Sequence, residues 1–271
     1  MFFRIVALLA GLTGALFAIL PAQAGTICTL LADAKSRAVL LAEGDCETRV
    51  TPASTFKIPL AVMAFDAGII TSAHEPKLPF RQGYADWIAA WRQDTDPLMW
   101  MHHSNVWYSQ RLTEQLGAEK LADYARSFNY GNADFSGDAG RDNGLERSWI
   151  SSSLKISPVE QAGFVAALVE RQLPVSLRAI DGAIGLLESP GTADGWQMWG
   201  KTGSAYPRRA DGSFDYARGW GWYVGWAERA GRQVVFVRLS QDEQRHEVSG
   251  GLRARDALMR EWLGVTERAG L

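Results

Sequence analysis

Ser54 and Lys57 stand at positions i and i+3, the spacing that puts two side chains on one face of a helix. A serine hydroxyl is a weak nucleophile and needs a partner base. A lysine can serve as that base only after it loses its charge, which apolar burial promotes. Phe56, Ile58 and Leu60 supply apolar neighbours. The pair predicts a nucleophile and its base, although most short Ser-x-x-Lys motifs are surface helix residues.

Three further motifs follow, and each has a structural as well as a functional interpretation. In Lys201-Thr202-Gly203 the lysine and threonine can hold a substrate carboxylate, and the glycine lets a ligand approach the backbone. The alternative is a strand that ends in a turn. In Ser104-Asn105-Val106, the serine can relay protons or cap a helix expected from Trp107. Tyr130-Gly131-Asn132 opens a glycine-rich loop. None of the three is decisive alone.

The order of the four motifs is more specific than any one of them. They run Ser-x-x-Lys, Ser-x-Val, Tyr-Gly-Asn, Lys-Thr-Gly. On these residues the sequence resembles the penicillin-recognising serine enzymes, and within them the class D β-lactamases, or oxacillinases. Class A members would carry Ser-Asp-Asn at the second motif and a downstream base glutamate. Trp149 and the glycine- and tryptophan-rich stretch 219–226 agree with class D, and the resemblance extends from about Cys28 to about Trp262.

The resemblance implies hydrolysis of the β-lactam ring of penicillin-type antibiotics through an acyl-enzyme at Ser54. Lys57 would be carboxylated by CO₂ to N6-carboxylysine and act as general base, and Trp149 would donate its indole N–H to that group. Ser104 would pass a proton toward the β-lactam nitrogen. The residues agree with this chemistry, because only a neutral amine attacks CO₂. Without the resemblance, Trp149 is more simply a core tryptophan.

The resemblance also implies the residues that bind substrate, which are Val106, Lys201, Thr202, Gly203, Ser204 and Arg253. The backbone N–H groups of Ser54 and Ser204 would form the oxyanion hole. Arg253 would bind the substrate carboxylate beside the Lys-Thr-Gly motif, with Arg255 as the alternative. The four histidines show no metal-ligand spacing, so we expect no metal and no cofactor beyond the CO₂ that modifies Lys57.

Two rival functions would use the same nucleophile. A D,D-peptidase acts on peptidoglycan and deacylates slowly after reaction with a β-lactam. A β-lactam sensor domain acylates and stays acylated, and it needs a retained membrane anchor and a signalling partner domain. A cleavable leader argues against the sensor.

The order of the helices and strands expected around these motifs predicts an α+β fold. Strands are expected near both ends of the chain and helices between them, so one antiparallel sheet would be built from both termini and flanked by helices, with an inserted all-helical subdomain. Residues 25–271 would form a single catalytic domain, with a sheet lobe of about 25–53 and 190–271 and a helical lobe of about 54–189. The expected strands are 27–32, 38–42, 197–202, 219–227 and 233–239, and the expected helices are 55–68, 85–92, 107–116, 118–128, 158–170 and 251–263, with a loop at 129–145. The last helix has Leu252, Leu258, Met259 and Trp262 as its expected buried face.

The first 24 residues have the pattern of a signal peptide. Arg4 precedes the apolar run 5–20, and Ala22-Gln23-Ala24 fits the small-x-small cleavage pattern. A retained anchor is the alternative, but the run is short for a membrane span. We expect cleavage before Gly25, a periplasmic protein and no membrane association afterwards.

The two cysteines fit an exported protein. An antiparallel hairpin centred near residues 36 and 37 would place Cys28 roughly opposite Cys46, and a disulfide would close its open end. Two separate buried thiols are the alternative.

The 28 basic and 30 acidic residues give a formal net charge of −2, which does not indicate a nucleic-acid partner. The expected partners are small β-lactam molecules.

Overall fold

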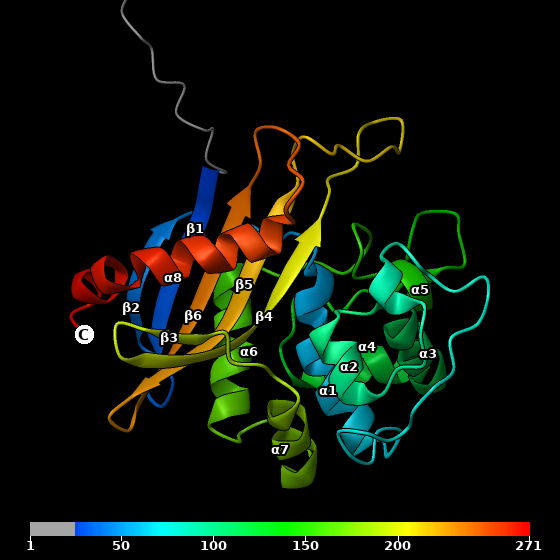
Figure 1. Ribbon diagram of the computed structural model, residues 1–271, viewed down its shortest axis with the longest axis horizontal. Coiled ribbons are helices and arrows are strands. Elements are labelled where there is room, and N and C mark those ends of the chain that lie inside the picture. The colour runs from blue at the N-terminus through cyan, green and yellow to red at the C-terminus, as the bar shows by residue number, and fades with distance from the viewer. Residues whose placement is uncertain (1–24) are drawn as a thin grey trace, which may run out of the picture.

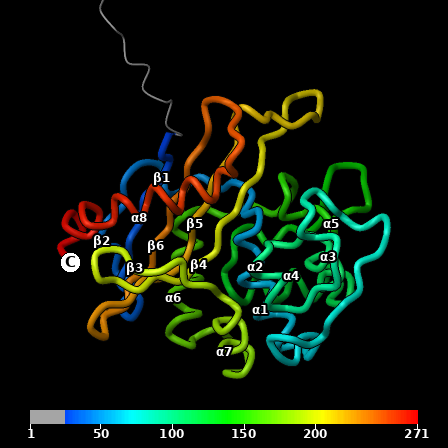
Figure 2. Tube along the Cα trace, in the orientation of Figure 1, coloured from blue at the N-terminus to red at the C-terminus, as the bar shows by residue number. Residues whose placement is uncertain are grey.

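The computed structural model describes residues 25–271, and the predicted signal peptide lies outside them. Its centre is a six-stranded sheet in which every neighbouring pair is antiparallel, in the order β2-β1-β6-β5-β4-β3. The strands are β1 Gly25–Asp33, β2 Val39–Gly44, β3 Gly191–Ala193, β4 Trp196–Ala205, β5 Trp220–Arg229 and β6 Arg232–Gln241. Figure 2 shows β1 beside β6, which joins the two ends of the chain in one sheet. The α+β prediction is confirmed.

Helices cover both faces of the sheet and form a group beside it (Figure 1). Helix α8 packs on β4, β5 and β6, and α6 packs on β1, β5 and β6. The helices are α1 Lys57–Asp66, α2 Pro97–His102, α3 Val106–Leu116, α4 Ala118–Ser127, α5 Gly144–Arg147, α6 Pro158–Val169, α7 Leu177–Gly185 and α8 Gly250–Arg268, with 3₁₀ turns η1 Ala53–Phe56 and η2 Ala89–Trp91. No helix within residues 25–271 is long and apolar enough to cross a membrane.

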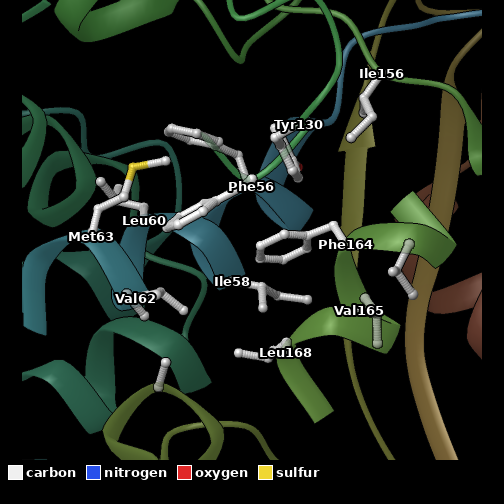
Figure 3. Close-up of a cluster of buried hydrophobic side chains, with 14 of the residues drawn as sticks. Phe56, Ile58, Leu60, Val62, Met63, Tyr130, Ile156, Phe164, Val165 and Leu168 are labelled. Carbon is white, nitrogen blue, oxygen red and sulfur yellow. The ribbon is translucent and has the colours of Figure 1, made fainter. Parts of the chain in front are cut away.

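The larger hydrophobic core lies between the sheet and the helical lobe. Its centre is α1, which is apolar on nearly every side and therefore needs neighbours all round. In Figure 3 Ile58 of α1 lies near Phe164 and Leu168 of α6. This burial holds the start of α1, and with it the Ser-x-x-Lys motif, at the junction of the two lobes.

The hairpin of β1 and β2 carries a disulfide between Cys28 and Cys46. The register differs from the expected one, because Cys28 pairs with Gly44 and the ladder is irregular between Leu31 and Ala32. Cys46 lies just beyond the strand and is still within reach, with a Cα–Cα distance of 5.1 Å. Gly44 has φ of +83°, and a Cβ there would lie 2.0 Å from the carbonyl oxygen of Ile27. The turn of the chain toward Cys46 therefore needs glycine.

Several predicted elements differ from the structure. The predicted helix 85–92 is wrong, because only η2 is helical there and Ile88 is extended. Tertiary contacts decide this segment: the indole N–H of Trp91 donates to the carbonyl of His103 at 2.8 Å. Helix α2 was not predicted although Asp96 caps it and Pro97 opens it. Elements α7, β3 and α5 were also not predicted, and α5 overlaps the end of the expected loop.

The buried face predicted for the last helix is partly wrong. Leu258 and Trp262 are buried in a second, smaller core between α8 and the sheet, and Met259 packs against that core while partly exposed. Leu252 is 37% exposed. It lies in the first turn of α8, which reaches past the sheet toward a cavity between the lobes.

Candidate active site

Ser54 lies in the 3₁₀ turn η1, which runs directly into α1 at Lys57. The Lys57 Nζ donates to Ser54 Oγ at 3.4 Å. Lys57 is only 1% exposed, and it forms no ion pair with any residue that the structure describes. Burial lowers the pKa of its amine well below the usual 10.5, and the charge of Lys201 lowers it further. The geometry therefore places a buried amine, whose pKa is lowered toward the neutral form, beside a serine hydroxyl, as the motif predicts.

Strand β4 packs directly against the serine turn at Gly203. A Cβ at this position would lie 2.9 Å from the carbonyl oxygen of Pro52 and 3.1 Å from the backbone nitrogen of Thr55. No larger residue allows the same approach unless one backbone segment moves. Glycine in the Lys-Thr-Gly motif thus lets β4, with its lysine and threonine, lie against the turn that carries Ser54.

Lys201 is buried within β4, and Ser204 is exposed near the strand's end. Burial lowers the pKa of Lys201 to about 8, against an upward contribution from Glu188 and a further downward one from Arg255. The Ser204 Oγ accepts a hydrogen bond from the backbone N–H of Gly251 at 2.8 Å. This bond fixes the start of α8 to the end of the motif.

Ser104 occupies the junction between α2 and α3, with φ of +53°. The cap of α3 is Asn105, whose side chain accepts from the N–H of Tyr108 at 3.1 Å. The alternative interpretation of Ser104 as the helix cap is therefore wrong. Helix α3 begins at Val106, which is 4% exposed, and both Ser104 and Val106 line the cavity that contains Ser54.

The Tyr-Gly-Asn motif lies behind the site and binds the segment that follows Trp149. Asn132 accepts from the N–H of Lys155 at 2.9 Å and donates to the carbonyl of Ser153 at 2.8 Å. A Cβ at Gly131 would lie 2.1 Å from the carbonyl oxygen of Lys155. The motif therefore supports a neighbouring loop and is not among the residues that line the main cavity.

Trp149 is buried and stacks on Phe56, with ring centroids 5.4 Å apart and an interplanar angle of 27°. Its carbonyl oxygen accepts from the N–H of Ala53 at 3.0 Å and from Thr51 Oγ1 at 2.7 Å. None of the hydrogen bonds found within residues 25–271 involves its indole N–H. Phe56, the residue before Lys57, thus packs against Trp149, whose indole N–H remains free to donate.

A cavity of about 500 Å³ joins the motifs. It confirms that the structure brings most of the predicted residues together, since Ser54, Ser104, Val106, Lys201, Thr202, Gly203 and Ser204 all line it. Its apolar wall was not predicted from the sequence and comprises Trp87, Ile88, Trp91, Ile150 and Leu252. Trp87 and Ile88 are 60% and 49% exposed, and only the structure reveals such large exposed apolar side chains as part of a binding surface.

Arg253 does not line this cavity. Its guanidinium is 2.5 Å from Asp242 Oδ1, and its Nε donates to the carbonyl of Val248 at 3.0 Å. Arg255 instead lines a smaller adjoining cavity of about 130 Å³ with Lys201 and Glu188. Arg253 is therefore held by Asp242 outside the main cavity, whereas Arg255 lines the adjoining cavity.

No group of three or more His, Cys, Asp or Glu residues in the described part of the chain is arranged to hold a metal ion.

Comparison with known proteins gives consistent results. The penicillin binding protein transpeptidase domain matches residues 27–264. Beta-lactamase OXA-9 of Klebsiella pneumoniae is 42% identical over 234 residues, which is 86% of this chain and 85% of that protein. Beta-lactamase OXA-1 of Escherichia coli is 37% identical over 214 residues, covering 78% and 74% of the two chains. The crystal structure of the class D β-lactamase OXA-427 has a TM-score of 0.82 at 42% identity and covers 89% of this chain and 99% of its own.

Proposed function

Since the chain belongs to the class D β-lactamases within the penicillin-binding transpeptidase family, we propose that it hydrolyses the β-lactam amide through an ester on Ser54. The observation that carries this mechanism is the buried Lys57 amine 3.4 Å from the Ser54 hydroxyl. A neutral amine can accept the proton that serine must lose when it attacks. No charged surface lysine could do so.

The reaction follows from the groups that line the cavity. The Ser54 oxygen attacks the β-lactam carbonyl carbon, and the serine proton passes to the Lys57 side chain. The C–N bond of the ring then breaks, and the leaving nitrogen receives a proton through the Ser104 hydroxyl. Water next gives a proton to the Lys57 side chain and attacks the ester carbonyl, and the Ser54 oxygen leaves and takes up that proton. Backbone N–H groups of Ser54 and Ser204 stabilise the negative oxygen in both steps.

The surroundings of Lys57 also fit carboxylation by CO₂. Only an uncharged amine reacts with CO₂, and burial lowers the pKa of this one. The unpartnered indole N–H of Trp149 can donate to an added oxygen, and Val106 limits the access of water. When bound, the CO₂ supplies an anionic oxygen base at the end of the lysine.

We assign the substrate carboxylate to Lys201 and Thr202, which line the cavity beside Ser54. Arg253 would join them only by releasing Asp242, whose side chain is 5% exposed and offsets its charge. Arg255 is the alternative, since it lines the adjoining cavity together with Lys201. Lys201 and Thr202 are therefore expected to provide most of the carboxylate affinity.

Export to the periplasm accompanies this function in our proposal. The disulfide between Cys28 and Cys46 is typical of an oxidising compartment. A signal peptide of residues 1–24 would place the protein there. N-terminal sequencing of the periplasmic protein should begin at Gly25, and recovery of the intact N-terminus in membranes would refute cleavage.

Steady-state hydrolysis of a chromogenic cephalosporin tests the proposed function. Many turnovers per enzyme are expected, and Ser54→Ala should remove them together with the covalent adduct seen by mass spectrometry. A stoichiometric burst followed by no further product would instead support a D,D-peptidase or a β-lactam sensor. Hydrolysis at the wild-type rate by Ser54→Ala would exclude Ser54 as the nucleophile.

A further inference from the structure

Thr51 precedes the serine turn and is 3% exposed. Its hydroxyl makes two hydrogen bonds to the segment that carries Trp149. It donates to the carbonyl oxygen of Trp149 at 2.7 Å and accepts from the N–H of Ser151 at 3.0 Å. One side chain therefore holds the backbone on both sides of Ile150.

Thr51 is itself held from the sheet. Its carbonyl oxygen accepts from the indole N–H of Trp222 in β5 at 2.9 Å, and Trp222 is fully buried. On either side, the N–H of Ala53 donates to the Trp149 carbonyl at 3.0 Å, and Val50 and Ile156 exchange backbone hydrogen bonds at 2.9 and 3.1 Å. The sheet thus holds Thr51, and Thr51 in turn holds the segment that carries Trp149.

The two joined segments need such restraint, because each contains a residue in the left-handed region. Ala53 has φ of +51° and Ser151 has φ of +55°, and neither is glycine. Backbone conformations of this kind persist only when the surrounding contacts over-determine them. Loss of the Thr51 hydroxyl would leave the Ser151 N–H without its partner and remove one of the two donors to the Trp149 carbonyl.

We infer that Thr51 is a positioning residue for Trp149, and that its hydroxyl sets the tryptophan so that the free indole N–H meets the carboxylated end of Lys57. This inference rests on the carboxylation proposed above. It predicts that the hydroxyl controls how tightly the protein retains CO₂ on Lys57, although the Thr51 hydroxyl forms no hydrogen bond to the lysine and Thr51 does not line the substrate cavity.

The test compares Thr51→Val, which keeps the shape and removes the hydroxyl, with Thr51→Ser, which keeps the hydroxyl. Both are titrated with ¹³C-bicarbonate, and the carbamate resonance of Lys57 is followed by ¹³C NMR without substrate. Losing the two buried hydrogen bonds of the Thr51 hydroxyl should raise the bicarbonate needed for half-maximal signal about tenfold in Thr51→Val. Thr51→Ser should stay within about twofold of wild type. Activity of Thr51→Val should recover in excess bicarbonate.

A matched control is Thr266→Val. Thr266 is 2% exposed, and its hydroxyl donates to backbone carbonyls within α8. This change should lower stability and leave the bicarbonate titration unchanged. Trp222→Phe, which removes the anchoring N–H and keeps the Thr51 hydroxyl, should raise the half-maximal bicarbonate by a smaller factor. If Thr51→Val does not fold, the bicarbonate titration of Trp222→Phe tests the inference in its place.

The possible failures are distinguishable. If wild type gives a carbamate signal and folded Thr51→Val titrates identically, the inference on Thr51 is overturned while the carboxylation proposal stands. If Thr51→Val is unfolded, an identical titration of Trp222→Phe overturns the inference in the same way. The absence of any carbamate signal in wild type overturns the proposed carboxylation of Lys57, and this inference with it.

Discussion

The amine of Lys57 lies 3.4 Å from the hydroxyl of Ser54 and is almost completely buried, without a carboxylate to compensate a charge. A charged ammonium in this position would pay a large desolvation penalty, so burial lowers the pKa of the lysine and favours its neutral form. Its location allows it to act on the serine before attack and on the water that later releases the product.

Replacing Lys57 with alanine should abolish turnover. Loss of a positioned base costs about 10²–10⁴-fold in rate. Deacylation should be affected together with acylation, because both need the same base. Mass spectrometry of Lys57→Ala mixed with a β-lactam should show any adduct persisting for hours, and normal release of the acid product would contradict the role assigned to this lysine.

Activity should depend on CO₂ most strongly at mildly acidic pH. Burial lowers the pKa of Lys57, so its neutral form persists to lower pH than in an exposed lysine and decreases as pH falls further. Protonation prevents reaction with CO₂, which shifts the enzyme to the unmodified lysine. Hydrolysis rates in degassed buffer should therefore fall at low pH and recover with bicarbonate. Rates that ignore both treatments would remove carboxylation from the mechanism.

The KM for β-lactams should rise above a pH of about 8. The pKa of Lys201 is about 8, so its ammonium is lost as pH increases through that value. The attraction for the substrate carboxylate disappears with the charge. Lys201→Arg keeps its charge in this range and should move the rise to higher pH. A KM profile identical in the two proteins would exclude Lys201 as the titrating group.

Asp242 offers a test of the role of Arg253. Asp242→Asn removes the charge that offsets this arginine, so KM should fall a few-fold if Arg253 binds the substrate carboxylate. The fall should vanish in the Arg253→Ala background, as a double-mutant cycle would show. If Arg255 binds the carboxylate instead, Arg255→Ala alone should raise KM, and Asp242→Asn should leave it unchanged.

Gly203→Ala should lower activity by separating β4 from the serine turn. The added Cβ would meet the Pro52 carbonyl at 2.9 Å, and overpacking of this kind costs about 1–3 kcal/mol. Both kcat/KM and Tm should decrease. Gly163→Ala is the matched control, since that helical Cβ would meet no atom within 4 Å. It should add about 0.5–1 kcal/mol of stability, with unchanged kinetics.

Much of the fold followed from local patterns. The alternation of apolar residues placed strands near both ends of the chain, and the capped, periodic segment 158–170 was expected as a helix close to the observed α6. Segment 85–92 resisted the same reasoning. Its apolar and charged residues suit a helix, but the contact of Trp91 with His103 outweighs that local preference.

The sequence by itself determined the proposed nucleophile, its partner lysine and the order of the motifs, because these depend on residue type and short spacing. Only the tertiary structure decided that Arg253 is held by Asp242, that Trp87 and Ile88 wall the cavity, and that Thr51 supports Trp149. The physical reason is that burial and charge pairing depend on which distant segments meet. Lys57 is recognisable from its neighbours in the chain, but the packing of the lobes around it buries its amine and lowers its pKa.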